Sequence, residues 1–492
     1  MIGVLILIKS FEISKMMLKM WQKEMGKLFN TGTKKAIAVL FLLLAVTMGS
    51  IIGYSFTGMF LSAFLNGEVR SLGLFVISMF MNASIFTFVF FILFKVRTPE
   101  QHSFSMQLSW FPLTAFQRSL GYFIPFAGAV SFLVLFMIFI LLIPNFVASG
   151  VGFWFAFAFF ALLFVQIIFF FSLLNLVYNL VYMLILKFGF PLQKFFSMFV
   201  LVVLAVFYGI TSFDLGNIQN AYSSFDYHLT YFAAPLFLML NGQASDAGVI
   251  PIVLILTAAV TASFMSLNVV PILTEKKSSK LFSFIKIPSS KPLSLAVKEI
   301  KSQARNEENI LNFIFLLLAL CFLKFKFQFG FTGESYLVLG GVTGIIAFNS
   351  FGNDLRMMQM YKALHLKTAT VLWSKYLGLC VLGLIQLFLF SVLTWTFPES
   401  FAVFVKTIAV LLNSIAMFYL AGIIFPLDRN NPYMGIFSFG MLLLFLIPLF
   451  FIVNYAVDNV TGEALLFFIP CLELLLILLL YGGFKWRYHY DH

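Results

Sequence analysis

Charged residues are scarce in this chain: Asp, Glu, Lys and Arg make up only 10% of its 492 residues. Hydrophobic residues account for 62%, and the mean hydropathy is +1.02. A water-soluble domain of this size has too little polar surface to cover so much apolar surface, so lipid must act as its solvent. The scarcity of charge therefore excludes a soluble globular protein and predicts a polytopic membrane protein.

Residue sets that bind metals and nucleotides are also missing. The three cysteines, Cys321, Cys380 and Cys471, lie in separate apolar runs without ligand spacing, which excludes a disulfide framework and a zinc site. No apolar run holds a histidine, so we expect no His-based metal site within the bilayer. The P-loop motif G-x-x-x-x-G-K-[ST] does not occur. We therefore expect neither a cofactor in this chain nor an enzymatic activity of its own.

Twelve apolar runs are candidates to cross the ~30 Å of hydrocarbon in a bilayer. They lie at residues 36–56, 72–94, 120–143, 151–186, 195–213, 249–273, 310–323, 336–351, 372–397, 401–425, 433–457 and 464–481. The fourth run exceeds one crossing, but dividing it would place the Lys-rich middle of the chain outside, so we predict one long helix. Its tail, with Asn175 and Asn179 one turn apart, is expected to leave the bilayer.

The distribution of basic residues predicts the orientation. With the N-terminus inside, every lysine and arginine lies in an inner segment except Arg70, Lys324, Lys326 and Lys406. Acidic residues show no such preference, as the positive-inside rule requires. The net charge of +12 is then a signature of topology and not of nucleic-acid binding. We expect a multi-pass protein of the cytoplasmic (inner) membrane with both termini inside.

The fold class predicted from these patterns is all-α, with about twelve transmembrane helices in two pseudo-repeated halves of six. Five parts follow in order: an amphipathic interfacial helix (1–35), the first half (36–273), a basic cytoplasmic linker with a second interfacial helix (274–309), the second half (310–484) and a tail (485–492). The tetrads Lys23-Glu24-Met25-Gly26 and Lys298-Glu299-Ile300-Lys301 begin alike in the two interfacial helices. Alternatively, any helix on a membrane surface would show this pattern.

The second inner loop of each half contains a short helix-forming segment. In the second half, polar Asp354 and Arg356 are followed by Met357, Met360, Tyr361 and Leu364 at helical spacing. Such a helix could offer a methionine-rich face to a soluble partner. The alternative, in which this face dips into lipid, stays open.

These segments resemble the permeases of ATP-binding-cassette (ABC) exporters of the second type. Residues that match the family's interfacial elbow helix and the loop that follows its second span are Lys298, Glu299, Arg305, Asn349, Phe351, Gly352, Asp354 and Lys375. In the first half, Pro112-Leu113-Thr114 fits the family's turn. The sequence departs from the pattern at His365-Leu366-Lys367, which replaces that turn, and at Ser374, where glycine is usual.

The resemblance implies that each inner loop forms a coupling helix seated on a separate nucleotide-binding ATPase subunit, of which two copies would hold ATP and Mg²⁺. The implied contact residues are Gln101, His102, Met106, Trp110, Phe111, Asp354, Arg356, Met357, Met360, Tyr361 and Leu364. The implied elbow residues are Lys23, Glu24, Lys298, Glu299 and Arg305. The substrate would be hydrophobic or amphipathic, such as a peptide, a lipid or a drug-like molecule, and would move outward.

Two further features concern the bilayer. Glu473 lies mid-span, where a charge costs ~2.5 to 3.5 kcal/mol, and Lys406 lies within ~6 Å of it in depth. Glu473 serves either substrate contact or gating, or it is a paired structural carboxyl. The outer loop at residues 214–248 encloses an apolar piece, residues 232–240, that is too short to cross. This piece forms either a re-entrant helix or a partly buried surface helix.

Two other functions remain open from the sequence. Twelve spans in two halves also suit an ion-coupled secondary transporter. That class is disfavoured because its Gly-x-x-x-Asp-Arg-x-Gly-Arg loop is missing and Glu473 is the one buried ionisable residue that the spans predict. A membrane scaffold is the third possibility.

Overall fold

The computed structural model is built from helices. It describes residues 2–28, 69–97, 110–188, 193–212, 215–224, 226–242, 249–269, 286–328, 333–348, 350–424 and 462–490, with residues 32, 35–36, 39–40, 42–43, 46–51, 53–55 and 108. Every regular element within these residues is helical. The chain divides at residue 276 into two compact units.

Among the described residues, six helices are long and apolar enough to cross a membrane. They are α3 (Val69–Arg97), α5 (Ala115–Ala148), α6 (Phe153–Lys187), α10 (Val249–Val269), α15 (Thr368–Leu393) and α16 (Phe401–Ile424). Shorter apolar stretches lie in α7 (Gln193–Ser212), α12 (Glu307–Phe327) and α13 (Gly333–Thr343). The helical membrane class is therefore confirmed. The predicted run at 433–457 lies wholly outside the described residues, and that at 36–56 is described with gaps.

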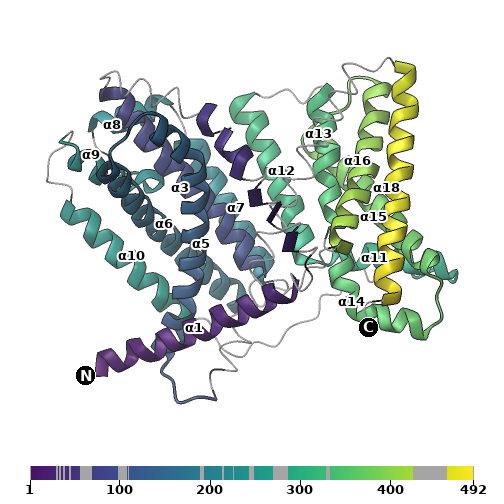
Figure 1. The fold of residues 1–492 in the computed structure, drawn as a ribbon, viewed down its shortest axis with the longest axis horizontal. Coiled ribbons are helices and arrows are strands. Elements are labelled where there is room, and N and C mark those ends of the chain that lie inside the picture. Colours follow the sequence, from purple (N-terminus) through teal and green to yellow (C-terminus); the bar gives the residue numbers. More distant parts are fainter. Residues whose placement is uncertain are drawn as a thin grey trace. The chain divides into compact units, whose positions relative to one another are not determined.

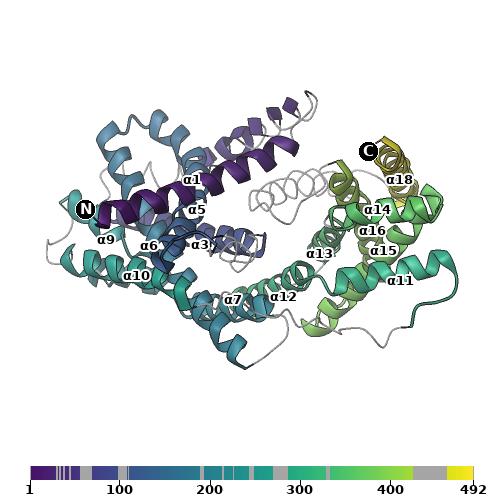
Figure 2. The same ribbon diagram turned by 90° about the horizontal axis from the view of Figure 1, so that it is seen from below.

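In the first unit, α1 (Ile2–Leu28) crosses the end of the span helices (Figures 1 and 2). One face of α1 is buried, with residues at helical spacing: Ser10, Ile13, Ser14, Met17 and Trp21. The Ser14 hydroxyl donates to the Gly121 carbonyl of α5 at 2.9 Å. Gly121 is required here, because a Cβ would lie 2.8 Å from the Ile13 side chain. The predicted interfacial helix is thus seated firmly on α5.

The fourth predicted span is one continuous helix, α6, as the charge distribution indicated. Its tail does not leave the unit. Asn175 and Asn179 are buried, and their side chains donate to the hydroxyls of Ser263 and Ser266 in α10 at 3.0 and 2.8 Å. These asparagines are therefore contacts between two apolar helices, and their position relative to the bilayer stays a prediction.

The predicted outer loop of the first unit contains α8 (Leu215–Ser224), the 3₁₀ turn η1 (Leu229–Tyr231) and α9 (Ala234–Leu240). Buried Gln166 of α6 donates to the Leu229 carbonyl at 2.9 Å and accepts from the Ala233 amide at 2.8 Å. Ser84, at the middle of the apolar stretch Leu72–Lys95, donates to the Thr230 carbonyl at 2.8 Å. The start of the apolar piece therefore lies beside Gln166 in the interior of α6, directly after a turn that contacts the middle of α3, and this burial favours the re-entrant alternative.

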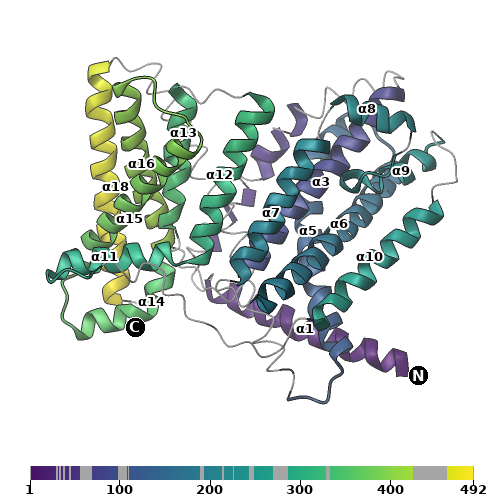
Figure 3. The same ribbon diagram turned by 180° about the vertical axis from the view of Figure 1, so that it is seen from behind.

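The second unit begins with α11 (Lys291–Ala304), which runs across the foot of α15 (Figure 3). At their crossing a Cβ on Gly378 would lie 2.8 Å from the Ala296 carbonyl oxygen, so the two helices touch backbone to backbone. The 3₁₀ turn η3 (Gly344–Ala347) and α14 (Ser350–Ala363) follow α13, and α18 (Gly462–Tyr490) closes the unit. Small residues also let α13 approach α16, where Gly340 faces the Thr407 carbonyl.

Candidate functional site

A buried ion pair lies where α11 crosses α15. The Lys375 ammonium is 3.2 Å from a Glu299 carboxylate oxygen, and the two side chains are only 2% and 1% exposed. Charges so fully removed from water are tolerated only when they are paired and hydrogen-bonded. Glu299 and Lys375, which the family resemblance singled out separately, therefore belong to one site.

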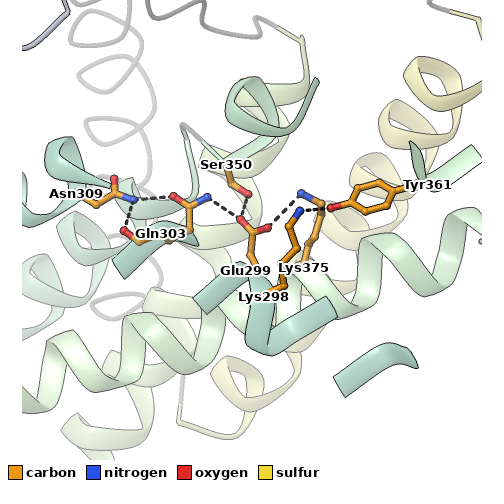
Figure 4. Close-up of polar contacts among 7 residues, drawn as sticks. All are labelled: Lys298, Glu299, Gln303, Asn309, Ser350, Tyr361 and Lys375. Carbon is orange, nitrogen blue, oxygen red and sulfur yellow. Dashed lines mark hydrogen bonds and ion pairs between the residues drawn. The ribbon is translucent and has the colours of Figure 1, made fainter. Parts of the chain in front are cut away.

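Polar groups from two more helices complete the shell around Glu299 (Figure 4). Ser350, the first residue of α14, and Gln303 of α11 each donate to the same Glu299 oxygen at 2.6 Å. Gln303 in turn accepts a hydrogen bond of 2.7 Å from Asn309 of α12. One carboxylate thus ties α11, α12, α14 and α15 together.

Tyr361 makes a second link between α11 and α14. The Lys298 ammonium donates to the Tyr361 hydroxyl and lies 4.9 Å from the centre of its ring. The Lys375 ammonium lies 5.9 Å from the centre of the same ring, so two cations lie close to one aromatic side chain. Tyr361 is buried. It was predicted as a residue that contacts a partner, but the structure places it on the side of α14 that faces α11.

Exposed apolar side chains of α14 lie next to Tyr361. Met357, Met360 and Leu364 are 39%, 46% and 60% exposed. Their spacing of three and four residues places them on one helical face, and Tyr361, four residues after Met357, lies at the edge of that face. Asp354 and Arg356 lie within α14, but their side chains are outside the described residues. The helix is therefore tied into the unit at Tyr361 and exposed beside it.

The predicted loop of the first unit is described only at its end. Trp110 and Phe111 are exposed, whereas Gln101, His102 and Met106 lie outside the described residues. The capping box of α5, in which Thr114 and Gln117 each bond the other's backbone amide, begins the next helix directly after this loop.

The elbow residues separate into two groups. Lys298 and Glu299 enter the network, while Arg305 is an exposed residue at the C-terminal end of α11. In α1, Lys23 is exposed, and the side chain of Glu24 is outside the described residues. The close crossing of α1 on α5 is made at Ile13 and not at the tetrad that begins with Lys23.

The intramembrane candidates Glu473 and Lys406 form no ion pair with each other in the described part of the chain. Glu473 is partly buried on α18, a helix that packs against α15 and α16, and its role stays a prediction.

Sequence inspection missed a buried lysine in the first unit. Lys95 of α3 lies 3.3 Å from the Asn175 amide oxygen, and its ammonium is 4.6 Å from the Tyr178 ring centre and 5.5 Å from that of Phe126. These partners are neutral. The sequence signal, a lysine next to an apolar run, is the same as for a lysine exposed at the membrane surface, so composition could not distinguish the two.

Lys324 is one of the few basic residues that the charge pattern places outside. Its ammonium donates to the Thr394 carbonyl and, at 3.2 Å, to the Trp395 carbonyl. These carbonyls belong to the C-terminal end of α15, where the helix dipole favours a cation. A local structural partner thus explains this exception to the positive-inside rule.

Within the described residues, no group of three or more His, Cys, Asp or Glu side chains is arranged to hold a metal ion. Comparisons with protein-family models, with curated proteins and with solved structures find no match for this chain. The function must therefore be argued from the residues and their geometry.

Proposed function

We propose that this chain is the membrane subunit of an ATP-driven ABC exporter. Two separate nucleotide-binding subunits, which hold ATP and Mg²⁺, would dock on its inner loops and drive a hydrophobic or amphipathic substrate outward. The chain would span the cytoplasmic membrane about twelve times in two pseudo-repeated halves. It would transport without being an ATPase itself.

The observation that carries this proposal is that α14 is anchored to the unit and exposes apolar side chains beside its anchor. Ser350 and Tyr361 tie it to the charged network on α11 and α15. Met357, Met360 and Leu364 are exposed next to Tyr361. Methionine packs adaptably against a partner's groove, and a helix anchored in this way can transmit the force of that partner.

The network supplies a route for that force. Glu299 of α11 accepts from Ser350 of α14 and pairs with Lys375 of α15, so a displacement of α14 must either move α11 and α15 with it or break the hydrogen bond between Ser350 and Glu299. A hydrogen bond to a charged group contributes roughly 1.5–3 kcal/mol. Movement of the connected helices as one body is therefore the easier response, and it is the kind of rigid-body motion that opens and closes transport pathways.

Co-purification tests this function. We expect a soluble ATPase to purify with the wild-type chain, and its ATP hydrolysis to fall at least tenfold in the preparation when Met357 and Met360 are both replaced by Asp. Met16→Asp is the matched control, because Met16 is an exposed methionine on α1, outside the proposed face. Equal ATPase activity in the double variant and the wild type would contradict the proposal.

One observation favours the alternative of an ion-coupled transporter. Lys95 is a buried ionisable residue of the first unit. The sequence alone had predicted Glu473 as the one such residue in the spans. Ionisable residues inside membrane helices are often part of ion pathways. Transport by the purified chain in vesicles that is driven by a proton gradient, without ATP, would favour this alternative.

A further inference from the structure

The C-terminal helix is longer than a membrane crossing requires. α18 has 29 residues, which at ~1.5 Å per residue is well beyond the ~30 Å of hydrocarbon. The predicted span ends at residue 481, and the turns that follow lie beside α14 (Figures 1 and 3). The sequence assigned residues 482–484 to the end of the second half and residues 485–492 only to a cytoplasmic tail.

Aromatic side chains of these turns pack against α14. The ring of Phe484 contacts the ring of Phe351, in the first turn of α14, with centroids 5.8 Å apart in an edge-on arrangement. Phe484 also stacks on Tyr488 at 5.9 Å. All three side chains are buried. Edge-on and stacked pairs of this kind favour a defined orientation of the helices that carry them.

Tyr488 also holds the other end of α14. Its hydroxyl donates to the Leu366 carbonyl at 3.2 Å, and the Lys362 ammonium lies 5.4 Å from its ring centre. His365 adopts φ +49°, and the Leu366 amide donates back to the Tyr361 carbonyl, which ends α14 in a Schellman-type turn. The Leu366 carbonyl is thus a fixed point just beyond the helix, and Tyr488 binds it.

Burial raises the pKa of Tyr488 above its ordinary value of 10.0. The hydroxyl therefore keeps its proton, and remains a donor to Leu366, throughout the physiological pH range.

We propose that Phe484 and Tyr488 form a clasp that fixes the orientation of α14, with Tyr488 as a positioning residue for the exposed methionine face. The Glu299 network holds α14 from one side, and the clasp holds it from α18. The presentation of Met357 and Met360 to a partner then depends on the last turns of the chain. This consequence for partner binding rests on the proposed function, whereas the clasp itself does not.

Hydrogen–deuterium exchange of the full-length protein in detergent tests the clasp without a partner. We expect the amides of residues 360–366 to exchange at least about tenfold faster in Tyr488→Ala, which loses both ring and hydroxyl, and about fivefold faster in Tyr488→Phe, which loses one hydrogen bond. Tyr481→Phe is the matched control, since it removes a partly exposed hydroxyl from the same helix, and it should leave α14 unchanged.

The outcomes separate the two proposals. Unchanged exchange of α14 in Tyr488→Ala overturns the clasp, and if that variant does not fold, unchanged exchange in Tyr488→Phe does so. Faster exchange with loss of the co-purified ATPase supports both the clasp and its role in presentation. Faster exchange with the ATPase retained overturns that role. If the wild-type chain binds no ATPase, the exporter proposal is refuted. Faster exchange in Tyr488→Ala would still support the clasp in that case.

Discussion

Among the residues that the structure describes, each unit buries one lysine near an end of a span helix, but the two units stabilise it differently. Lys375 in the second unit is paired with the carboxylate of Glu299. Lys95 in the first unit is surrounded by aromatic rings and the neutral amide of Asn175. The ion pair ties an interfacial helix to a span helix, and its carboxylate also binds the loop helix α14, whereas the aromatic surroundings of Lys95 join only span helices. The two units therefore stabilise a buried lysine by different chemistry.

The largest expected effect comes from breaking the ion pair. Glu299→Gln leaves the Lys375 charge buried without a counter-ion, so we expect the free energy of unfolding to fall by roughly 3–5 kcal/mol. SDS-driven unfolding in mixed micelles would measure it. The double variant with Lys375→Met should recover most of the loss, because no charge is then left unpaired; strictly additive losses would refute the pair as a stabilising unit.

The crossing of α1 on α5 and that of α11 on α15 should differ less in how strongly a glycine substitution destabilises them. A methyl group at Gly378 meets the Ala296 carbonyl oxygen, while one at Gly121 meets the Ile13 side chain, both at 2.8 Å. We expect each Gly→Ala change to cost about 1–3 kcal/mol, with Gly378→Ala the more severe because backbone yields less readily than a side chain. Gly128→Ala is the control, since no atom lies within 4 Å of its added methyl. The reverse order would show that the α1 crossing is the tighter one.

The smallest effect is expected at Lys95. Replacement by Met keeps apolar contact with the Tyr178 and Phe126 rings and removes a buried charge that has no carboxylate partner among the described residues. We predict a change in unfolding free energy of less than about 1 kcal/mol, in contrast to Lys375→Met, which leaves Glu299 unpaired. The same unfolding assay applies. If Lys95→Met lowers the free energy of unfolding as much as Lys375→Met does, the two units do not differ in how they stabilise a buried lysine.

Much of the fold could be predicted from the sequence, because hydropathy and basic residues respond directly to the bilayer. The long apolar runs lie in helices wherever the structure describes them, and α6 is one helix as the charges required. Hydrogen bonds between spans could not be predicted in this way. In the sequence, Asn175 and Asn179 cannot be distinguished from exposed polar residues. Only their hydrogen bonds to α10 show that they are interhelical contacts.

The site was predicted in part. The sequence singled out Glu299, Lys375 and Tyr361 but assigned them to separate features, because the residues are distant in the chain. Ser350, which begins α14 and binds Glu299, and Tyr488, which binds the turn beyond the end of α14, carried no sequence signal. A serine and a tyrosine are ordinary in such positions, and their roles depend on contacts that only the packing of the helices creates.

The central claim is that the methionine face of α14 binds a separate ATPase. A photo-crosslinking amino acid at position 360 tests it most directly in intact membranes, with the same group at position 16 as a control. The account predicts that position 360, and not position 16, captures a soluble polypeptide containing a P-loop, identified by mass spectrometry. Crosslinking of position 360 to lipid alone would contradict it.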